Sequence, residues 1–442
     1  MNFAVAASDA DLVLRGGAIG SPRLTAGPGR GITESLASHL ERLGDPLGAI
    51  GKTSPTEFIQ MVRKSGLRGR GGGGFPVGEK LAAVASRTGF GNRALVVANA
   101  AESEPASAKD RFLLSARPHL VLDGIEIAAR AVGARQAYIS ISQRSDRAVR
   151  ALRQALVERV EARSLPVPVE VVLAAPTFVG GDETALLGWI AGGAPSPTLV
   201  PPLPAEKGLR GRPTLVQNAE TLAHLALIAR FGPEWFRRVG TEEEPGTMLV
   251  TVSGSVARAG VYEAPIGVGL ADVLEAAGWS AETDFILVGG YFGSWVTRQD
   301  ADERALSRAS LASSGASPGA GVILALPNSA CGIRETAEAV DWLAGASSGQ
   351  CGPCVQGLAA VAVCVTQLAS PATAHRADLE RLVRWCSEIE GRGACRHPDG
   401  VVKLVRSSLH VFASEVEVHR RGRCSGSYEG WLPLPLTGRA SR

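Results

Sequence analysis

The stretch Ser65-Gly-Leu-Arg-Gly-Arg-Gly-Gly-Gly-Gly-Phe-Pro-Val-Gly-Glu-Lys80 is a glycine-dense loop, and a segment with helical spacing leads into it from Pro55. Glycine adopts positive φ at little cost, so such a loop can bring backbone N–H groups close to a phosphate. Arg70 or Lys80 could supply positive charge. A glycine run alone is as common in mobile linkers, so its meaning depends on the rest of the chain.

Downstream of the loop, apolar runs of strand length alternate with segments of helical period. The runs at 95–98, 137–142 and 167–174 read as strands, and those at 120–132 and 146–162 read as helices. This alternation predicts an α/β layer with parallel strands, continuing to about Phe231. We expect one domain over residues 51–241, preceded by an N-terminal extension over residues 1–50.

The predicted pattern of strands and helices changes after Glu242. Strand-like runs surround one short helical segment at 270–277, which predicts a compact α+β domain of the β-grasp type over residues 242–333. Within it, the Ser/Ala/Gly-rich residues 308–320 read as a flexible surface loop. Apolar residues then recur at steps of three and four, which predicts a four-helix bundle over 334–420 and an irregular tail over 421–442.

Composition excludes several classes of protein. A formal charge of +3 with 45% hydrophobic residues argues against nucleic-acid binding and indicates a globular protein. No basic region leads into an apolar run at the N-terminus, and no apolar run reaches the roughly 20 residues of a membrane helix. Seven cysteines, an odd number, favour metal or redox ligation over a disulfide framework. We expect a cytoplasmic protein.

A fourth candidate ligand, Cys395, follows the motif Ser348-Gly-Gln-Cys351-Gly-Pro-Cys354 later in the chain. A Cys-x-x-Cys turn suits a metal or a redox disulfide, and because a helical segment rather than a strand precedes this one, a metal site is favoured. Zinc held by the three cysteines and His397 is one alternative, and unligated buried cysteines are another. The unligated interpretation is favoured for the remaining four cysteines, of which two lie within helical segments and two have no spaced partner: Cys364, Cys386, Cys331 and Cys424.

Three more polar motifs stand at expected helix starts downstream of the glycine loop. They are Asn99-Ala-Ala-Glu-Ser-Glu104-Pro, Gly180-Gly-Asp-Glu183-Thr-Ala-Leu and Pro213-Thr-Leu-Val-Gln-Asn218-Ala-Glu220-Thr221. Together with Lys109-Asp-Arg, and in this order and spacing, they resemble the NADH-oxidising flavoprotein subunit of respiratory complex I, a family shared with soluble hydrogenases and formate dehydrogenases. The resemblance covers about residues 50–415.

The resemblance implies FMN on a Rossmann-like domain, an SLBB-like β-grasp domain, and a helical bundle with a [4Fe–4S] cluster. Hydride would arrive from NAD(H), and single electrons would leave to a ferredoxin-like or [2Fe–2S] subunit, or to a membrane-bound electron-transfer complex. The cofactor would carry the chemistry, without a protein nucleophile or general base. Glu183 would lie beside the flavin ring, and Lys80 near the phosphate.

Carried over residue by residue, the resemblance assigns two sets of residues. The FMN site would comprise Gly69, Arg70, Gly71, Gly72, Gly74, Phe75, Lys80, Asn99, Glu102, Glu104, Gly181, Glu183, Asn218 and Thr221. The cluster ligands would be Ser348, Cys351, Cys354 and Cys395.

The chain departs from the family pattern at several of these motifs. Positions expected to hold the adenine half of NADH carry small or aliphatic residues here, and acidic positions near the flavin are Ala or a shorter Asp: Ala83, Val200, Leu203, Ala101 and Asp182. A non-catalytic paralogue is therefore the alternative hypothesis. At the cluster, serine replaces the first cysteine. An alkoxide ligand would lower the cluster potential, because a harder donor favours ferric iron; a three-cysteine [3Fe–4S] or open-cornered [4Fe–4S] cluster, or a zinc-filled or empty site, are the other outcomes.

Overall fold

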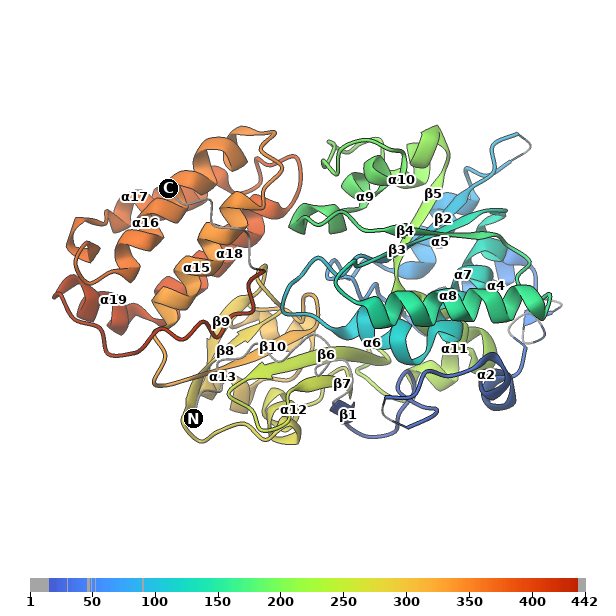
Figure 1. Cartoon of the computed structure of the whole chain (residues 1–442), viewed down its shortest axis with the longest axis horizontal. Helices are drawn as coiled ribbons and strands as arrows, with labels where there is room; N and C mark the ends of the chain where they lie inside the picture. The colour runs from blue at the N-terminus through green and yellow to red at the C-terminus, as the bar shows by residue number, and fades with distance from the viewer. Residues whose placement is uncertain are drawn as a thin grey trace.

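The computed structural model describes residues 16–435 except 30, 46, 47, 49, 52 and 90. The first residues of the predicted N-terminal extension and the end of the predicted tail, 436–442, lie outside the described residues. Figure 1 shows three bodies: a sheet flanked by helices, a second sheet, and a bundle of helices.

The first body is built on a four-stranded sheet in the order β4-β3-β2-β5, with all neighbouring strands parallel. Its strands are β2 (Leu95–Ala100), β3 (Ala137–Ile141), β4 (Val169–Leu173) and β5 (Thr214–Asn218). The predicted parallel α/β layer is thus confirmed. The longer flanking helices are α4 (Pro55–Ser65), α5 (Val77–Ala85), α6 (Lys109–Ala116), α7 (Pro118–Val132), α8 (Asp146–Glu161), α9 (Glu183–Ile190) and α11 (Ala219–Arg237). Short turns add η1 (Phe178–Gly181), α10 (Pro204–Lys207) and η2 (Leu209–Gly211).

The second body is a six-stranded mixed sheet in the order β1-β7-β6-β10-β8-β9. Its strands are β6 (Thr247–Gly254), β7 (Gly260–Pro265), β8 (Thr283–Val288), β9 (Ser294–Thr297), β10 (Val322–Pro327) and, from the N-terminal segment, β1 (Gly16–Ala18), which pairs in parallel with β7. The helix α12 (Leu270–Ala277) packs against one face of this sheet. The N-terminal segment also forms α2 (Leu36–Leu43), which begins at the Ser35 cap.

The expectation of a loop at 308–320 is wrong for residues 308–312, while residues 313–320 form neither helix nor strand. Residues Arg308–Ala312 form the helix α14, which Ser307 caps by accepting a hydrogen bond from the Ser310 N–H at 3.1 Å. Further along, a Cβ placed on Gly319 would lie 2.3 Å from the carbonyl oxygen of Gly289. The small residues there permit close backbone packing rather than mobility. A second short helix, α13 (Arg298–Glu303), follows β9.

The third body is the predicted helical bundle. It contains α15 (Gly332–Gly345), a π-helical turn η3 (Pro353–Leu358), α16 (Ala359–Ala369), the short η4 (Ala374–Arg376), α17 (Leu379–Ile389), α18 (His397–Val411) and α19 (Ala413–Arg420). The predicted fourth helix is two helices, since the chain bends at Phe412, whose buried ring packs against Phe285 and Trp295 of the second sheet. The bundle covers the sheet face opposite α12.

Phe178 of η1 joins the first body to the bundle. Its ring lies edge-on to Phe292, Trp342 and His397, with centroid separations of 4.7, 5.5 and 5.6 Å. Because Phe178, Phe292 and Trp342 belong to a single hydrophobic cluster, the first body and the bundle share a core at this point.

Glu104 joins the first body to the second sheet. This buried carboxylate accepts hydrogen bonds from the backbone N–H of Tyr291 at 2.9 Å and of Ala106 at 3.3 Å. Burial raises its pKa from 4.5 to about 7, because the two N–H donors only partly offset the loss of water.

The closest contact between α7 and α11 depends on Gly124. A Cβ at this position would lie 2.0 Å from the carbonyl oxygen of Leu222. We expect Gly124→Ala to destabilise the protein by about 2 kcal/mol or more, since two helix backbones must separate. Urea unfolding followed by circular dichroism measures this. Gly345→Ala, in a helix with open space around the glycine, is the control and should leave stability unchanged or slightly higher.

The buried Glu104 predicts a pH-dependent stability. A carboxyl whose pKa is higher in the folded than in the unfolded chain favours folding when protonated, so its contribution is lost as pH rises from about 4.5 through about 7. Between pH 5 and pH 8 the stability of the wild type should therefore fall relative to that of Glu104→Gln by about 2 to 3 kcal/mol. Urea unfolding at both pH values tests this, with the exposed Glu243→Gln as control. Equal pH profiles for wild type and Glu104→Gln would contradict it.

Candidate functional site

The glycine stretch forms a tight loop between α4 and α5. The Gly69 N–H donates to the Phe75 carbonyl at 2.9 Å, and Gly72 and Gly74 adopt φ values of 105° and 64°. A Cβ on Gly71 would lie 3.2 Å from the Asn218 side chain. The loop therefore sits directly against the start of α11, as close as glycine allows.

Arg70 forms hydrogen bonds that hold this loop against the rest of the protein, and its side chain does not project into the expected binding site. Its backbone N–H donates to the Thr221 hydroxyl at 2.9 Å, and its buried guanidinium donates to the carbonyls of Thr247 and Pro245, each at 3.2 Å. Burial lowers the pKa of Arg70, although Glu220 and Glu244 partly counter the effect. The charge of Arg70 is committed to protein groups.

A different arginine reaches the glycines. Arg308 donates to the Gly72 carbonyl at 3.0 Å and lies 3.3 Å from the Glu244 carboxylate. A Cβ on Gly74 would fall 2.3 Å from its guanidinium carbon. Sequence reasoning missed Arg308, because no local motif distinguishes it and it comes from the second sheet's domain.

Asn99 and Asn218 lie side by side at the carboxyl ends of β2 and β5, where they are register partners. Asn99 donates to the Gly181 carbonyl at 2.9 Å, and Asn218 donates to the Asn99 carbonyl at 3.2 Å and to Asp110 at 2.6 Å. This sheet edge is where parallel α/β folds bind ligands. The structure thus brings together the four separate motifs predicted to form one site.

A buried charge cluster supports this edge. The Lys109 ammonium lies 2.8 Å from Asp110 and 3.0 Å from Glu220, and donates to Asn218 at 3.1 Å. Burial disfavours the charged forms of Lys109 and Glu220. The attraction between the ammonium and its carboxylate neighbours outweighs burial, so the pKa of Lys109 is raised and that of Glu220 is held at about 2. Sequence reasoning recognised Lys109-Asp-Arg as a motif but assigned no binding role to Lys109, Asp110 or Glu220.

The other predicted residues are placed differently. Lys80 forms an ion pair with Glu183. Glu102 accepts hydrogen bonds from the Asp110 and Arg111 N–H groups and from the Arg111 guanidinium, so its carboxylate caps α6. Glu104 faces the second sheet, as described above, and Phe75 is 58% exposed.

These features fit a flavin nucleotide. A Cβ on Gly181 would lie 2.3 Å from the Ser103 hydroxyl, and one on Gly71 would make a tight contact with Asn218. The loop, the paired Asn side chains and the Lys80–Glu183 pair provide the donors and acceptors that a phosphate, a polyol and a polar ring require.

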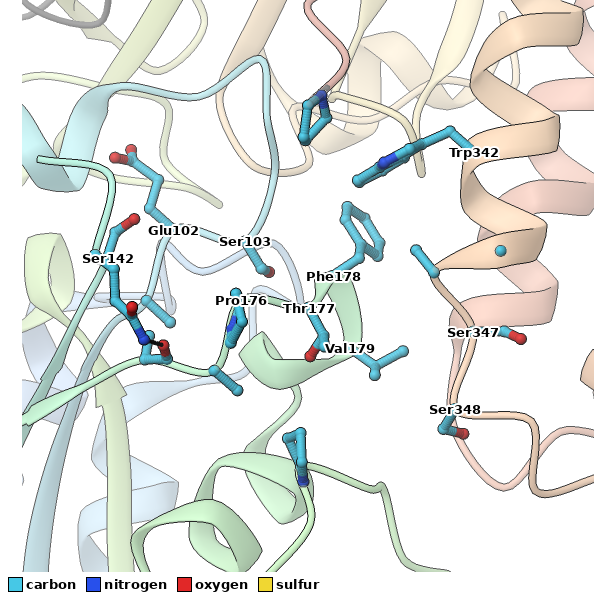
Figure 2. Close-up of a pocket in the computed structure, with 18 of the residues that line it drawn as sticks. Glu102, Ser103, Ser142, Pro176, Thr177, Phe178, Val179, Trp342, Ser347 and Ser348 are labelled. Atoms are coloured by element: carbon cyan, nitrogen blue, oxygen red, sulfur yellow. Dashed lines mark hydrogen bonds between the residues drawn. The ribbon is translucent and has the colours of Figure 1, made fainter. Parts of the chain in front are cut away.

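A cavity of about 560 Å³ separates the first body from the bundle. Figure 2 shows Pro176, Thr177 and Val179 on one side of it and Trp342 and Ser348 on the other. Ser348 therefore lies on the wall of a cleft that reaches the η1 segment.

Cys351, Cys354 and Cys395 lie near enough to one another for the charge of one to affect the pKa of another. Burial and the Cys351 charge raise the pKa of Cys354 to about 12, partly opposed by the Ser347 hydroxyl. At Cys351, burial is outweighed by hydrogen bonds from the N–H groups of Ala394 and Cys354, and its pKa is lowered. At Cys395, burial raises the pKa, with the His397 N–H opposing it. Backbone N–H groups aimed at cysteine sulfurs are what an iron–sulfur site uses to stabilise thiolates.

A single zinc ion fits these cysteines less well. Among the described residues, one group of potential ligands gathers its atoms within 4.8 Å of one another, and it contains none of these three cysteines. The His397 ring bonds the Leu343 carbonyl through Nε2 at 2.8 Å and packs against Phe178. The three sulfurs are not all within that spacing, which suits a multi-iron cluster better than one zinc, since zinc draws its thiolates to about 3.8 Å from one another.

Comparisons with known proteins agree with this arrangement. Three family models match: the Nuo51 FMN-binding domain over residues 62–227, the SLBB domain over 249–284, and the NADH-ubiquinone oxidoreductase-F iron–sulfur binding region over 334–419. Among the described residues, no helix is both long and apolar enough to cross a bilayer.

Similar proteins span most of the chain. The F-type subunit 2 of the NADH-quinone oxidoreductase of Rhizobium meliloti (strain 1021) is 32% identical over 84% of this chain and 90% of its own length. The NADP-reducing hydrogenase subunit HndC of Solidesulfovibrio fructosivorans is 28% identical over 87% of this chain and 81% of its own. A crystal structure of an NAD+-reducing [NiFe]-hydrogenase in the air-oxidized state matches with a TM-score of 0.78 and 28% identity over 88% of this chain and 67% of that one. The chain belongs to the family of NADH-quinone oxidoreductase F-type subunits and is an FMN- and iron–sulfur-dependent oxidoreductase subunit.

Proposed function

We propose that this subunit takes electrons from a reduced pyridine nucleotide at the glycine loop and passes them across the η1 segment to a cluster held by Cys351, Cys354, Cys395 and Ser348. FMN, when bound, supplies the conversion of a hydride into two single electrons. The glycine loop would hold the phosphate, Asn99 and Asn218 would orient the polyol chain, and the Lys80–Glu183 pair would flank the ring.

One observation carries this proposal: the short segment 178–183 contacts both candidate cofactor sites. At its glycine-loop side, Glu183 pairs with Lys80, and the Gly181 carbonyl accepts from Asn99. At its bundle side, the Asp182 charge acts on Cys395, and Phe178 packs against His397, which follows Cys395 closely in the chain. The short span supports direct electron transfer between the two sites.

The nucleotide's adenine half is proposed to lie along an exposed apolar edge beside α5. Phe75, Val200 and Leu203 are 58%, 47% and 53% exposed. Leu203 precedes α10, which packs against α5. This edge offers apolar area but fewer aromatic faces for stacking, so it supports a weaker adenine contact than the family pattern implies.

The electron acceptor is proposed to be a ferredoxin-like or [2Fe–2S] protein subunit, in the cytoplasm or on the cytoplasmic side of a membrane complex. The support is that the related proteins bear names of subunits, of NADH-quinone oxidoreductase and of NADP-reducing hydrogenase. An alternative is a non-catalytic paralogue, favoured by the serine at position 348.

The role of Ser348 is tested by EPR of the anaerobically purified, dithionite-reduced protein. If its oxygen ligates iron, Ser348→Cys should shift the g values and raise the cluster midpoint potential, because a thiolate stabilises ferric iron less than an alkoxide does. Ser348→Ala should convert the signal to that of a three-cysteine cluster. Ser347→Ala, which removes a hydroxyl against Cys354, is the matched control and should retain the wild-type cluster type. Identical spectra in the wild type and both Ser348 variants would exclude ligation.

The same samples distinguish an active oxidoreductase from a non-catalytic paralogue. NADH or NADPH added anaerobically should bleach the flavin absorption of the wild type and generate the reduced-cluster signal. A colourless protein, or a flavin reduced by dithionite but by neither nucleotide, would contradict the proposed activity.

If the adenine of NADH binds at the exposed apolar edge beside α5, an added aromatic ring there should raise the affinity for NADH. Leu203→Phe should lower the KM for NADH about 2- to 10-fold, the equivalent of a restored stacking contact of about 0.5 to 1.5 kcal/mol, without changing kcat. Steady-state kinetics with an artificial acceptor measures both.

This prediction has two controls: a substrate that lacks adenine and a variant at a neighbouring position. Reduced nicotinamide mononucleotide lacks adenine, so Leu203→Phe should not improve its KM. Leu199→Phe adds the same ring at a neighbouring position that is 72% exposed and should have little effect. Equal gains with both substrates would place the adenine elsewhere.

A further inference from the structure

Four potential metal ligands converge at the far end of the bundle, away from the cysteines of the proposed cluster. They are Cys331, Glu415, His419 and Cys424, and their ligand atoms all lie within 4.8 Å of one another. The first precedes α15, the next two lie one turn apart on α19, and the last follows α19. The expectation of unligated cysteines at 331 and 424 therefore overlooked that the fold brings them together.

The spacing matches one tetrahedral ion. The Cys331 sulfur lies 3.5 Å from His419 Nε2 and 3.8 Å from a Glu415 carboxylate oxygen. Zinc with bonds of about 2.3 Å to sulfur and about 2.0 Å to nitrogen places those two ligand atoms about 3.5 Å apart. The Cys424 thiol lies against both Cys331 and Glu415.

The histidine is oriented as a ligand. His419 is fully buried, and its Nδ1 lies 2.8 Å from the Leu368 carbonyl oxygen. A carbonyl only accepts hydrogen bonds, so the proton resides on Nδ1, and in the neutral ring Nε2 presents its lone pair to the cysteines. A second hydrogen bond of this kind accompanies most metal-bound histidines.

Glu415 is held in a similar way. The Ser425 hydroxyl donates to its Oε2, the Ser425 N–H donates to its Oε1 at 3.1 Å, and Oε1 also faces His419 at 2.9 Å. Both carboxylate oxygens are thus held by Ser425, and Oε1 is the one directed at the group. A metal-free arrangement would instead be an ion pair between His419 and Glu415 with two thiols beside it.

The group joins the start of α15 to the chain after α19, which is also held by hydrogen bonds from the Gly430 and Leu432 N–H groups to Glu335 and by the buried Leu432 side chain. Cys331 donates its N–H to the Ser427 carbonyl at 2.8 Å, and the Ser427 N–H donates to the Ser329 carbonyl at 2.7 Å. These two backbone hydrogen bonds and the four side chains connect the end of β10 to the chain after α19. A structural zinc would add a further link to this junction, because an ion that binds the folded state stabilises it.

We propose that Cys331, Glu415, His419 and Cys424 bind a structural Zn2+ ion that fastens the segment after α19 to the start of α15. Two thiolates, one imidazole and one carboxylate in a closed tetrahedral set favour zinc over calcium or magnesium, which prefer all-oxygen sites. The site is separate from the proposed cluster, since its ligand group contains none of Cys351, Cys354 and Cys395.

The test is metal analysis of the full-length protein, purified anaerobically and dialysed without chelator. We expect about one zinc per chain beside the iron. Cys331→Ser/Cys424→Ser should lose the zinc and keep the iron. The control Cys364→Ala/Cys386→Ala changes two buried cysteines outside the group and should keep both metals. Absence of zinc from the wild type, or zinc retained in Cys331→Ser/Cys424→Ser, would overturn the proposal.

A second measurement needs no variant and so does not depend on whether a variant folds. Zinc X-ray absorption of the wild type should show two sulfur and two nitrogen or oxygen neighbours, at about 2.3 Å and about 2.0 Å. Three or four sulfur neighbours would place the zinc at Cys351, Cys354 and Cys395 instead and would overturn the assignment.

Discussion

The packing of Phe178 against the bundle is the constraint on which the rest of the site depends. The ring is held by three aromatic neighbours from two other bodies of the molecule, at centroid separations of 4.7 to 5.6 Å. At the other end of the same segment, Glu183 is tied to Lys80 of α5, and the Asp182 carboxylate between them caps α9 through the Thr184 N–H at 2.9 Å. A segment fixed at both ends sets the separation between the glycine loop and the bundle, and the proposed electron transfer would cross this fixed spacing.

At the polar edge of the parallel sheet, the side chains are likewise held in fixed positions by the protein. Lys109, Asp110 and Glu220 are buried and mutually paired, an arrangement that is expensive to desolvate and adds little net stability. Its consequence is orientation: it holds the Asn218 amide, which in turn contacts the Asn99 backbone. A prearranged set of donors and acceptors binds a ligand without a further cost of reorganisation at the time of binding.

The sequence predicted the long, strongly periodic elements well, because burial of one face imposes its period on the residues. The helices α7 and α8 fall within two residues of their expected positions. It failed where a contact distant in sequence decides the local structure. The three-residue β1 exists because β7 offers it an edge, α18 ends because Phe412 turns into the second sheet, and Gly319 is ordered by Gly289.

The same distinction applies to the sites. Motifs with several characteristic residues, such as Cys351-Gly-Pro-Cys354 and the glycine loop, could be interpreted from their own spacing, whereas Arg308, His419 and Cys424 carry no local pattern. The departures from the family pattern also have a spatial order. Leu203 and Val200 lie at the exposed edge proposed for the nucleotide, Ala101 and Ser348 line the cleft before the bundle, and Asp182 caps α9, while Asn99, Asn218 and Glu183 retain the expected residue types. Under the proposed function, Leu203 and Val200 alter the contact with the donor, Ala101 and Asp182 alter the polar surroundings of the flavin, and Ser348 alters the potential of the cluster. The serine at position 348 therefore belongs to a set of substitutions spread along the proposed electron path rather than being an isolated change.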